Sequence, residues 1–336
     1  MIARAAGGLR PDAEPHAELQ RARSVLAHPQ DLHCVVFHLG VLALYGLSFW
    51  IWTHRAAVGI APGLETTAFA LGAALLLGWC SGIEVGVNFH NHAHRRVFTR
   101  PWMNRWFGRT WTVSAGWPAY FWQYSHVTVH HRHLLEEADW TLPKRTTDGQ
   151  WEGFFRYCLL HWPFRYAGHL WRDLRSPVAA PAVAARARRE FAIFAALFSI
   201  PFFIDPVGAL WLWVLPAWIA NVLVVAPGMF AQHAGRKAPG PDHVFCHSNT
   251  FRSKLFNLTM FNIGFHAEHH TFPHVHWSDL PGLHEVLKRE LVDEEAHVVP
   301  FGYYRGGYLL SRAALGNAAA AEEWSEQHPD YVKEAP

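Results

Sequence analysis

Long apolar stretches are the feature that most constrains what this chain can fold into. Val35–Trp52 is 18 residues long, with His38 as its only group that titrates near neutral pH, and Thr66–Phe89 is 24 residues long. Phe191–Phe230 is 40 residues long and is broken at Asp205 and the proline after it. A helix needs about 20 apolar residues to cross a bilayer, so the third stretch has room for two crossings.

These lengths predict an all-α integral membrane fold with four transmembrane helices in two hairpins and a cap of further helices. A soluble helical core with at most two spans is the alternative. Lysine and arginine are frequent before the first span, between the second and third, and after the fourth, but scarce in the two short loops. Because positive residues collect on the cytoplasmic side, we expect both termini and the cap to be cytoplasmic.

The long segment between the second and third spans is rich in tryptophan, especially over Pro101–Tyr124. Aromatic residues mixed with arginine are typical of amphipathic helices that lie in the membrane interface, and ordinary helices of a soluble cap are the alternative. We expect a cytoplasmic arm over residues 1–32, a membrane catalytic domain over 33–290 and a cytoplasmic tail over 291–336.

Charge and cysteine content exclude other classes of protein. The chain has 29 Lys and Arg against 27 Asp and Glu, a formal net charge of +2, so we expect no nucleic-acid partner, which would need a strong basic excess. The four cysteines lie far apart and form no C-x-x-C pair. We therefore expect neither a thiolate metal site nor a disulfide framework.

Histidines gather in three clusters just beyond the ends of the predicted spans. The chain has 25 of them. The clusters are His90-Asn91-His92-Ala93-His94, His126-Val127-Thr128-Val129-His130-His131 and His266-Ala267-Glu268-His269-His270, and His233 stands alone after the fourth span. Residues three and four apart share a helix face, so each cluster can direct two or three imidazoles to one point. The number of imidazoles suits two ions, and iron, zinc, copper and nickel all accept this ligand.

The succession H-x-x-x-H, H-x-x-x-H-H and H-x-x-H-H resembles the membrane fatty acid desaturase and hydroxylase superfamily. The run His269–Pro273 and the later Leu280–His284 also look like this family, and the resemblance covers Glu84 to His284. It implies a non-haem di-iron centre, O₂ as co-substrate and an external electron donor such as a ferredoxin, a rubredoxin or a haem cytochrome. Carried onto this chain, the implied metal ligands are His90, His94, His126, His130, His131, His233, His266, His269 and His270.

Four further residues are candidates to support the metal ligands. Glu84 lies inside the second span, where an ionisable group is costly, and it either orients a ligand imidazole or pairs with a nearby side chain for structure. His92 could replace or assist His90, although on a helix it faces away from His94. Asn262 is expected one helical turn before His266, and His274 flanks the third cluster.

The resemblance implies desaturation of a fatty acyl or lipid hydrocarbon chain. Two alternatives stay open. The second cluster has three residues before its histidine pair, a spacing closer to alkane hydroxylases, so an alkane or acyl-chain monooxygenase is the first alternative. A divalent-metal transporter is the second, and because transport sites lie near the bilayer midplane, it would depend on His38 and Glu84.

Overall fold

The computed structural model describes residues 24–136, 138–143, 152–175, 181–236, 244–293, 298–299 and 302–303. Most of these residues are helical, and two short strands, β1 (Thr250–Phe251) and β2 (Val298–Val299), pair in parallel. The expectation of a mainly helical fold is confirmed. The boundaries of the arm and the tail stay predictions, because most of both segments lies outside the described residues.

Among the described residues, three helices are long and apolar enough to cross a membrane. The first is α2 (Asp31–Thr53). The second runs without a break over Leu64–His94 and consists of α3 (Leu64–Ile83), the π-helical segment η2 (Glu84–Phe89) and α4 (His90–His94). The third runs over Pro206–His233 and consists of α11 (Pro206–Ala209), η5 (Leu210–Val214), α12 (Leu215–Ala220), η6 (Asn221–Val225) and α13 (Ala226–His233).

The fourth expected span corresponds to α10 (Pro181–Ile204), which is not among these three helices. Its first half carries three arginines and Glu190, and these charges lower its hydropathy. A fourth crossing is therefore not confirmed. The chain does turn at Asp205, as expected, because this carboxylate accepts a hydrogen bond from the backbone N–H of Gly208 (2.8 Å) and so begins α11. The same carboxylate accepts from Trp52 Nε1 (3.0 Å), which joins α11 to the end of α2.

Small residues and apolar outer faces characterise the bundle of long helices. The side chains of Leu39, Leu75 and Leu210 are exposed, as expected for a surface that meets lipid. Inside, α3 packs closely against α12 and η6, and a Cβ added at Gly82 would lie 2.3 Å from the Cβ of Val224. Small residues of this kind allow helix backbones to approach closely in membranes.

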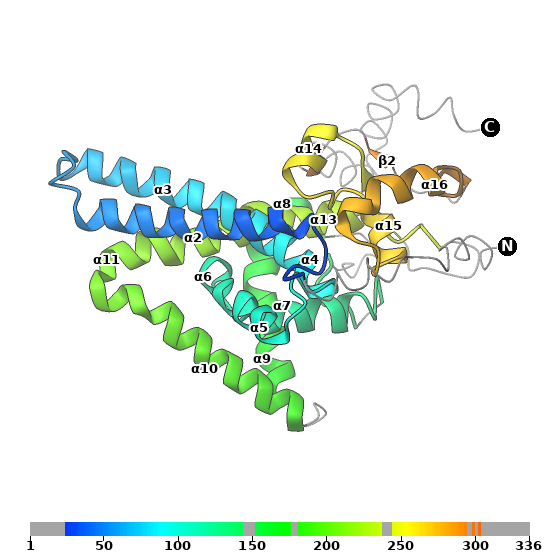
Figure 1. The fold of residues 1–336 in the computed structure, drawn as a ribbon, viewed down its shortest axis with the longest axis horizontal. Helices are drawn as coiled ribbons and strands as arrows, with labels where there is room; N and C mark the ends of the chain where they lie inside the picture. The colour runs from blue at the N-terminus through cyan, green and yellow to red at the C-terminus, as the bar shows by residue number, and fades with distance from the viewer. Residues whose placement is uncertain are drawn as a thin grey trace.

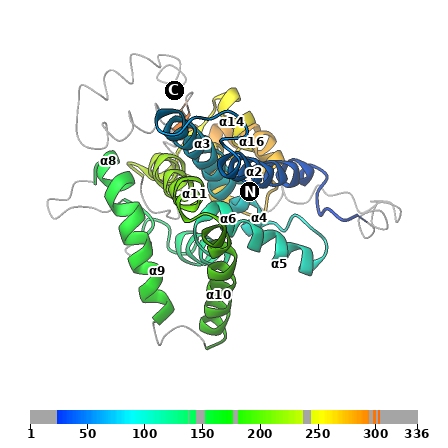
Figure 2. The same ribbon diagram turned by 90° about the vertical axis from the view of Figure 1, so that its left-hand side faces the viewer.

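The remaining helices form a cap at one end of α2 and α3 (Figures 1 and 2). Large aromatic side chains hold it together, and Trp111, Trp162 and Tyr157 are fully buried. The cap elements are α5 (Pro101–Thr110), α6 (Thr112–Ala115), α7 (Ala119–Gln123), η3 (Tyr124–His130), α8 (Phe154–Arg156), η4 (Tyr157–Arg165), α9 (Tyr166–Arg175), α14 (Lys254–Thr259), α15 (His266–Thr271), η7 (Trp277–Asp279) and α16 (Leu280–Asp293).

Candidate metal centre

Nine imidazoles converge where the cap meets the ends of the long helices. Their nitrogen atoms form two groups, and within each group one nitrogen from every ring lies within 4.8 Å of the others. The first group contains His90, His94, His126, His131 and His269, and the second contains His130, His233, His266 and His270. The structure thus brings together all nine histidines that the sequence singled out as ligands.

The first cluster contributes two rings to one group. His90 and His94 lie one helical turn apart on α4, at the end of the long second helix, and both belong to the first group. This geometry is the one that the four-residue spacing predicts. The long helix therefore delivers both imidazoles from the same face.

The second cluster does not converge on one point, contrary to expectation. His126 and His131 belong to the first group, whereas His130 belongs to the second. The reason is that η3 is π-helical, and the backbone N–H of His131 bonds to the carbonyl of His126 (2.9 Å). A π-helix closes its hydrogen bonds over five residues, so residue i+5 lies over residue i, and His130 is directed to one side.

The third cluster is divided in the same way between the two groups. His266 and His270 are one turn apart on α15 and belong to the second group, while His269 belongs to the first. His233 ends α13 and completes the second group. Each group therefore combines histidines that precede the third long helix in the sequence with histidines that follow it.

Several ring nitrogens lie within hydrogen-bonding distance of a nitrogen of another histidine ring. The Nε2 atom of His266 lies 3.1 Å from that of His233 and 3.0 Å from that of His270. In the first group, the Nε2 atoms of His126 and His131 are 3.1 Å apart. Lone pairs at this distance repel unless a cation or a shared proton lies between them.

Three more Nε2 atoms of the first group are buried and have no hydrogen-bond partner among the described residues: those of His90, His94 and His269. Buried polar atoms in folded proteins are almost always satisfied, and an exception calls for an explanation such as an ion. The rings present therefore fit a metal that accepts imidazole nitrogen.

The electrostatics of the site favour neutral rings. Burial lowers the pKa well below its ordinary value in five rings of the cap, and neighbouring histidines lower it further: His126, His131, His266, His269 and His270. Only an unprotonated nitrogen can bind a metal. At neutral pH these imidazoles are therefore in the form that a metal needs.

Two rings of the second group are fixed through their other nitrogen. Nδ1 of His130 lies 2.9 Å from Asp139 Oδ2, and Thr141 Oγ1 donates to the second carboxylate oxygen of Asp139 (2.5 Å). Nδ1 of His233 lies 3.0 Å from the carbonyl oxygen of His247. Because a carboxylate and a carbonyl accept hydrogen bonds, both Nδ1 atoms carry the proton, and both Nε2 lone pairs face the group.

The sequence interpretation assigned no role to Asp139, and it missed the partner of Glu268. Glu268 lies within the third cluster, is fully buried, and contacts Nδ1 of His284 and the hydroxyl of Thr250. It thereby anchors α15 to α16 and β1. A carboxylate placed between clustered histidines was the available signal for Glu268, whereas nothing in the spacing marks Asp139.

Glu84 and His92 lie away from the two groups. Glu84 is fully buried and contacts Nδ1 of His38, whose Nε2 lies 2.8 Å from Thr110 Oγ1. Of its two expected roles, the structure shows pairing with a neighbour rather than contact with a ligand imidazole. The His92 ring stacks on Phe89 and faces a separate pocket, so His90, and not His92, supplies the first ring of the cluster.

The expected position of Asn262, one helical turn before His266, is wrong, and a supporting role for His274 stays a prediction. Asn262 precedes α15 in a turn with a left-handed backbone (φ 60°), and its side chain donates to the carbonyl of Trp277 (3.2 Å). It therefore stabilises the turn and is not one helical turn behind His266. His274 is exposed, and its backbone carbonyl accepts from Arg95 (3.3 Å).

Comparison with known proteins identifies a family. The family model described as "Fatty acid desaturase" matches residues 65–302, which is well over half of the chain and includes all nine histidines. No curated protein matches the chain.

Proposed function

The chain belongs to the fatty acid desaturase family, and on this premise we propose that it is a membrane oxidase that desaturates the hydrocarbon chain of a fatty acyl substrate. The family makes it an oxidoreductase associated with a membrane and with lipid. The proposal adds two bound irons, O₂ as co-substrate and electrons from a separate ferredoxin, rubredoxin or haem cytochrome.

The observation that carries the proposal is the division of nine imidazoles, six buried and three half-buried, into two adjacent groups. Bound iron would supply the reduction of O₂ and the oxidising power that an unactivated C–H bond requires. The first group would hold one ion with Nε2 atoms that have no other described partner, and the second would hold another with His130 and His233 oriented by Asp139 and the His247 carbonyl.

Apolar residues beside the first group would exclude water from the proposed metal site. The Trp122 ring stacks on His126, with ring centroids 5.4 Å apart. Trp122 also lines a cavity of about 30 Å³ with Val87, Val224 and Met229, between the second and third long helices. A cavity of this volume admits only a group about the size of one or two waters, so a hydrocarbon chain would have to widen it.

The positions of the histidines support four crossings. His94 ends the second long helix and His233 ends the third, and their rings lie in neighbouring groups at one level. The chain must therefore return to the far end between these residues. The long element that leads back to the turn at Asp205 is α10, so its part from Phe191 onward is proposed as the third transmembrane segment, with the charged residues before Phe191 in the cap.

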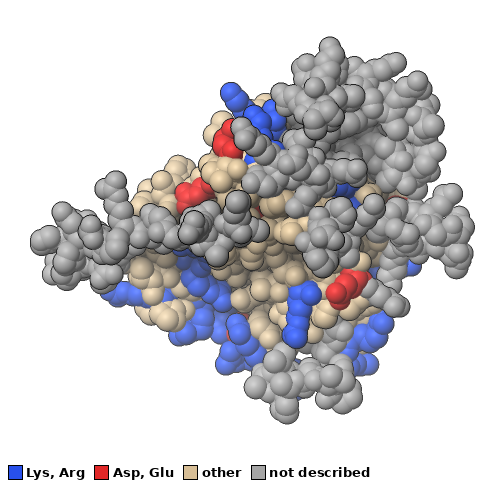
Figure 3. Space-filling model, turned by 90° about the vertical axis from the view of Figure 1, so that its right-hand side faces the viewer, with Lys and Arg blue, Asp and Glu red and all other residues tan. Residues whose placement is uncertain are grey.

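Charge supports a cytoplasmic cap. Viewed from the cap end, lysine and arginine outnumber acidic residues on the surface that the described residues form (Figure 3). Positive residues remain on the cytoplasmic side of membrane proteins. The metal centre, which lies beneath this cap, is therefore proposed to be cytoplasmic as well.

Metal analysis of the purified protein tests the proposal. Two irons per chain are expected, with loss of bound iron in His90→Ala and in His130→Ala. The control is His274→Ala, which changes an exposed histidine outside both groups and should retain both ions. One zinc without iron, or iron retained in both site variants, would contradict the proposal.

Hydroxylation remains the second candidate, because three residues precede the histidine pair of the second cluster. Mass spectrometry of the products distinguishes the two reactions, since desaturation removes two hydrogens and hydroxylation adds one oxygen. Transport of a divalent metal has less support. Its mid-membrane candidates, His38 and Glu84, contact each other and belong to none of the groups of three or more metal-binding side chains found among the described residues.

A further inference from the structure

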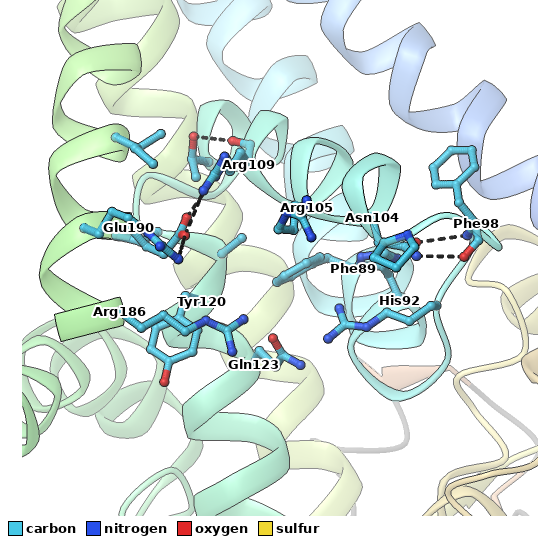
Figure 4. A pocket seen from close by; sticks show the side chains of 18 of the residues that line it. Phe89, His92, Phe98, Asn104, Arg105, Arg109, Tyr120, Gln123, Arg186 and Glu190 are labelled. Atoms are coloured by element: carbon cyan, nitrogen blue, oxygen red, sulfur yellow. Dashed lines mark hydrogen bonds and ion pairs between the residues drawn. The ribbon is translucent and has the colours of Figure 1, made fainter. Parts of the chain in front are cut away.

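A pocket lies beside the first histidine cluster, between the cap and α10 (Figure 4). Its volume is about 650 Å³. One wall comes from η2 and α4, a second from α5 and α7, and a third from the first half of α10. Figure 4 shows Arg105 and Arg186 on different walls, with Gln123 below Arg105 and His92 farther from Arg186, on the right.

Arginine dominates the lining. Among the described residues, the lining contains one acidic side chain, that of Glu190, and five arginines: Arg96, Arg105, Arg109, Arg186 and Arg189. Glu190 is already occupied, because its two oxygens accept from Nη2 and Nε of Arg109 (3.0 and 3.1 Å) and one also accepts from Arg189 (3.3 Å). Its single charge therefore cannot neutralise the other arginines.

The other three arginines form no ion pair with a carboxylate in the described part of the chain. Arg186 lies over the Tyr120 ring at 4.4 Å, which holds its guanidinium against the pocket wall. Arg96 and Arg186 line the same pocket and carry the same charge, so they repel each other. Their repulsion would be relieved by an anion.

The pocket is fixed relative to the metal centre. Phe89 and His92, which line it, flank His90 of the first group. Gln123, on another wall, precedes His126 by three residues. An anion bound here would therefore be held at a constant distance from α4 and η3, which bring four of the five rings of the first group, and this is what positioning of a substrate requires.

We propose that this arginine pocket binds the phosphate-bearing headgroup to which the acyl substrate is attached. The inference rests on the proposed function, which supplies the acyl chain. Several guanidinium groups around one pocket suit a phosphate, because each offers paired N–H donors to its oxygens. An alkane has no charged group that could interact with these arginines. The volume also exceeds what a single carboxylate needs, and leaves room for a headgroup.

Binding to the full-length protein in a phosphate-free maltoside detergent tests the inference. The probes are dioleoyl phosphatidylglycerol, oleoyl-coenzyme A and dioleoylglycerol, which has the same chains as the first without its phosphate. At least one phosphate-bearing probe should bind about tenfold or more tightly than dioleoylglycerol. Whichever of the two binds more tightly identifies the source of the phosphate as a membrane lipid or a soluble carrier.

The double variant Arg105→Gln/Arg186→Gln should weaken binding of that probe by about tenfold or more, with an unchanged melting temperature and iron content. Arg252→Gln is the matched control, because Arg252 is exposed, lies in the cap and does not line the pocket. Equal affinity for dioleoylglycerol, or an equal loss in the Arg252 variant, would overturn the inference. Binding needs neither O₂ nor electrons, so intact binding without oxidation would count only against the proposed function.

Discussion

At the scale of single residues, the centre depends on which nitrogen of each imidazole is held. Asp139 is buried and contacts Nδ1 of His130, and the backbone N–H of Thr141 donates to the same carboxylate (3.1 Å). The Asp139 carboxylate is thus held in place by the turn that follows it, and it in turn orients the His130 ring. An imidazole held in this way loses little freedom when it binds a metal.

Replacing Asp139 by alanine should therefore weaken iron binding by about 10–100-fold, because His130 would lose its orientation. Titration of the apoprotein with ferrous iron measures the affinity. Glu136→Ala is a suitable control, since Glu136 is exposed and contacts His133, which lies outside both groups. An Asp139 variant with the affinity of the control would show that the carboxylate does not support the site.

Eight of the nine histidines stand in clusters that the sequence shows directly, because helical spacing is a local property, whereas His233 stands alone and was singled out through the family resemblance. Asp139 could not be, since its contact with His130 depends on a turn of irregular backbone after η3. The placement of Asn262 failed for a related reason. The spacing suggested a helix through this residue, but a left-handed backbone at Phe261 and Asn262 separates α14 from α15.

At the scale of helices, the packing of the second long helix against the third depends on glycine. Gly78 faces Ile219, Gly82 faces Val224 and Gly86 faces Val225, so three glycines four residues apart form one stripe. The stripe brings η2, and with it the first histidine cluster, against the helix that ends at His233. Close packing along this glycine stripe therefore sets the distance between the two groups of histidines.

Gly82→Ala should destabilise the protein by about 1–3 kcal/mol, as overpacking of a tight interface does, since the added Cβ would lie 2.3 Å from a Val224 carbon. Thermal unfolding in detergent measures the change. Gly72→Ala on the same helix meets nothing within 4 Å and should be neutral or slightly stabilising. Equal melting temperatures for the two variants would contradict this account of the interface.

The contact between α5 and α10 should depend on pH. Burial tends to raise the pKa of Glu190, but the hydrogen bonds and charges of Arg109 and Arg189 outweigh it, and the pKa lies below its ordinary value. The charged form is therefore the one that stabilises the fold, by at most about 1 kcal/mol for a pair this accessible. This stability is present near neutral pH and is lost as the pH falls through the lowered pKa.

Accordingly, Glu190→Gln should melt at a lower temperature than the wild type near neutral pH, and the difference should vanish in acid. Thermal unfolding over a pH series measures it. The exposed Glu285 provides the control, because Glu285→Gln should show no such trend. A difference that persisted below the range in which glutamate titrates would exclude the ion pair as its source.

The division of the second cluster between two groups is an element-scale feature that the sequence could not reveal. Regular helical spacing places His126 and His130 together and leaves His131 facing elsewhere. The π-helical winding of η3 instead unites His126 with His131. Such local winding depends on packing in the cap, where Trp122 stacks on His126, and no spacing rule contains that information.

At the scale of the whole molecule, the cap lies at one end of the long helices (Figure 1). The nine imidazoles belong to α4, α13, α15 and η3 with the residue that follows it. Three of the spans could be predicted from length and hydropathy alone. α10 could not be settled in this way, because its charged first half packs against cap elements α5, α6 and α7 and only its second half is continuously apolar.

Labelling of single cysteines tests the proposed orientation. In a background with the four native cysteines replaced by serine, an impermeant maleimide should label Ala57→Cys, in the loop between α2 and α3, on intact cells. Arg252→Cys in the cap should be labelled only after the membrane is permeabilised. The reverse pattern would place the cap and the metal centre on the outer side.

The mixed membership of the two groups has a consequence for the order of biosynthesis. The first group needs His269 in addition to four rings from the first 131 residues, and the second needs His130 in addition to three rings from His233 onward. Neither group is complete until the ribosome has passed residue 269. If the early helices enter the bilayer during synthesis, they do so before either group is complete, and loading of the proposed metals into complete sites would be a late event in the maturation of the protein.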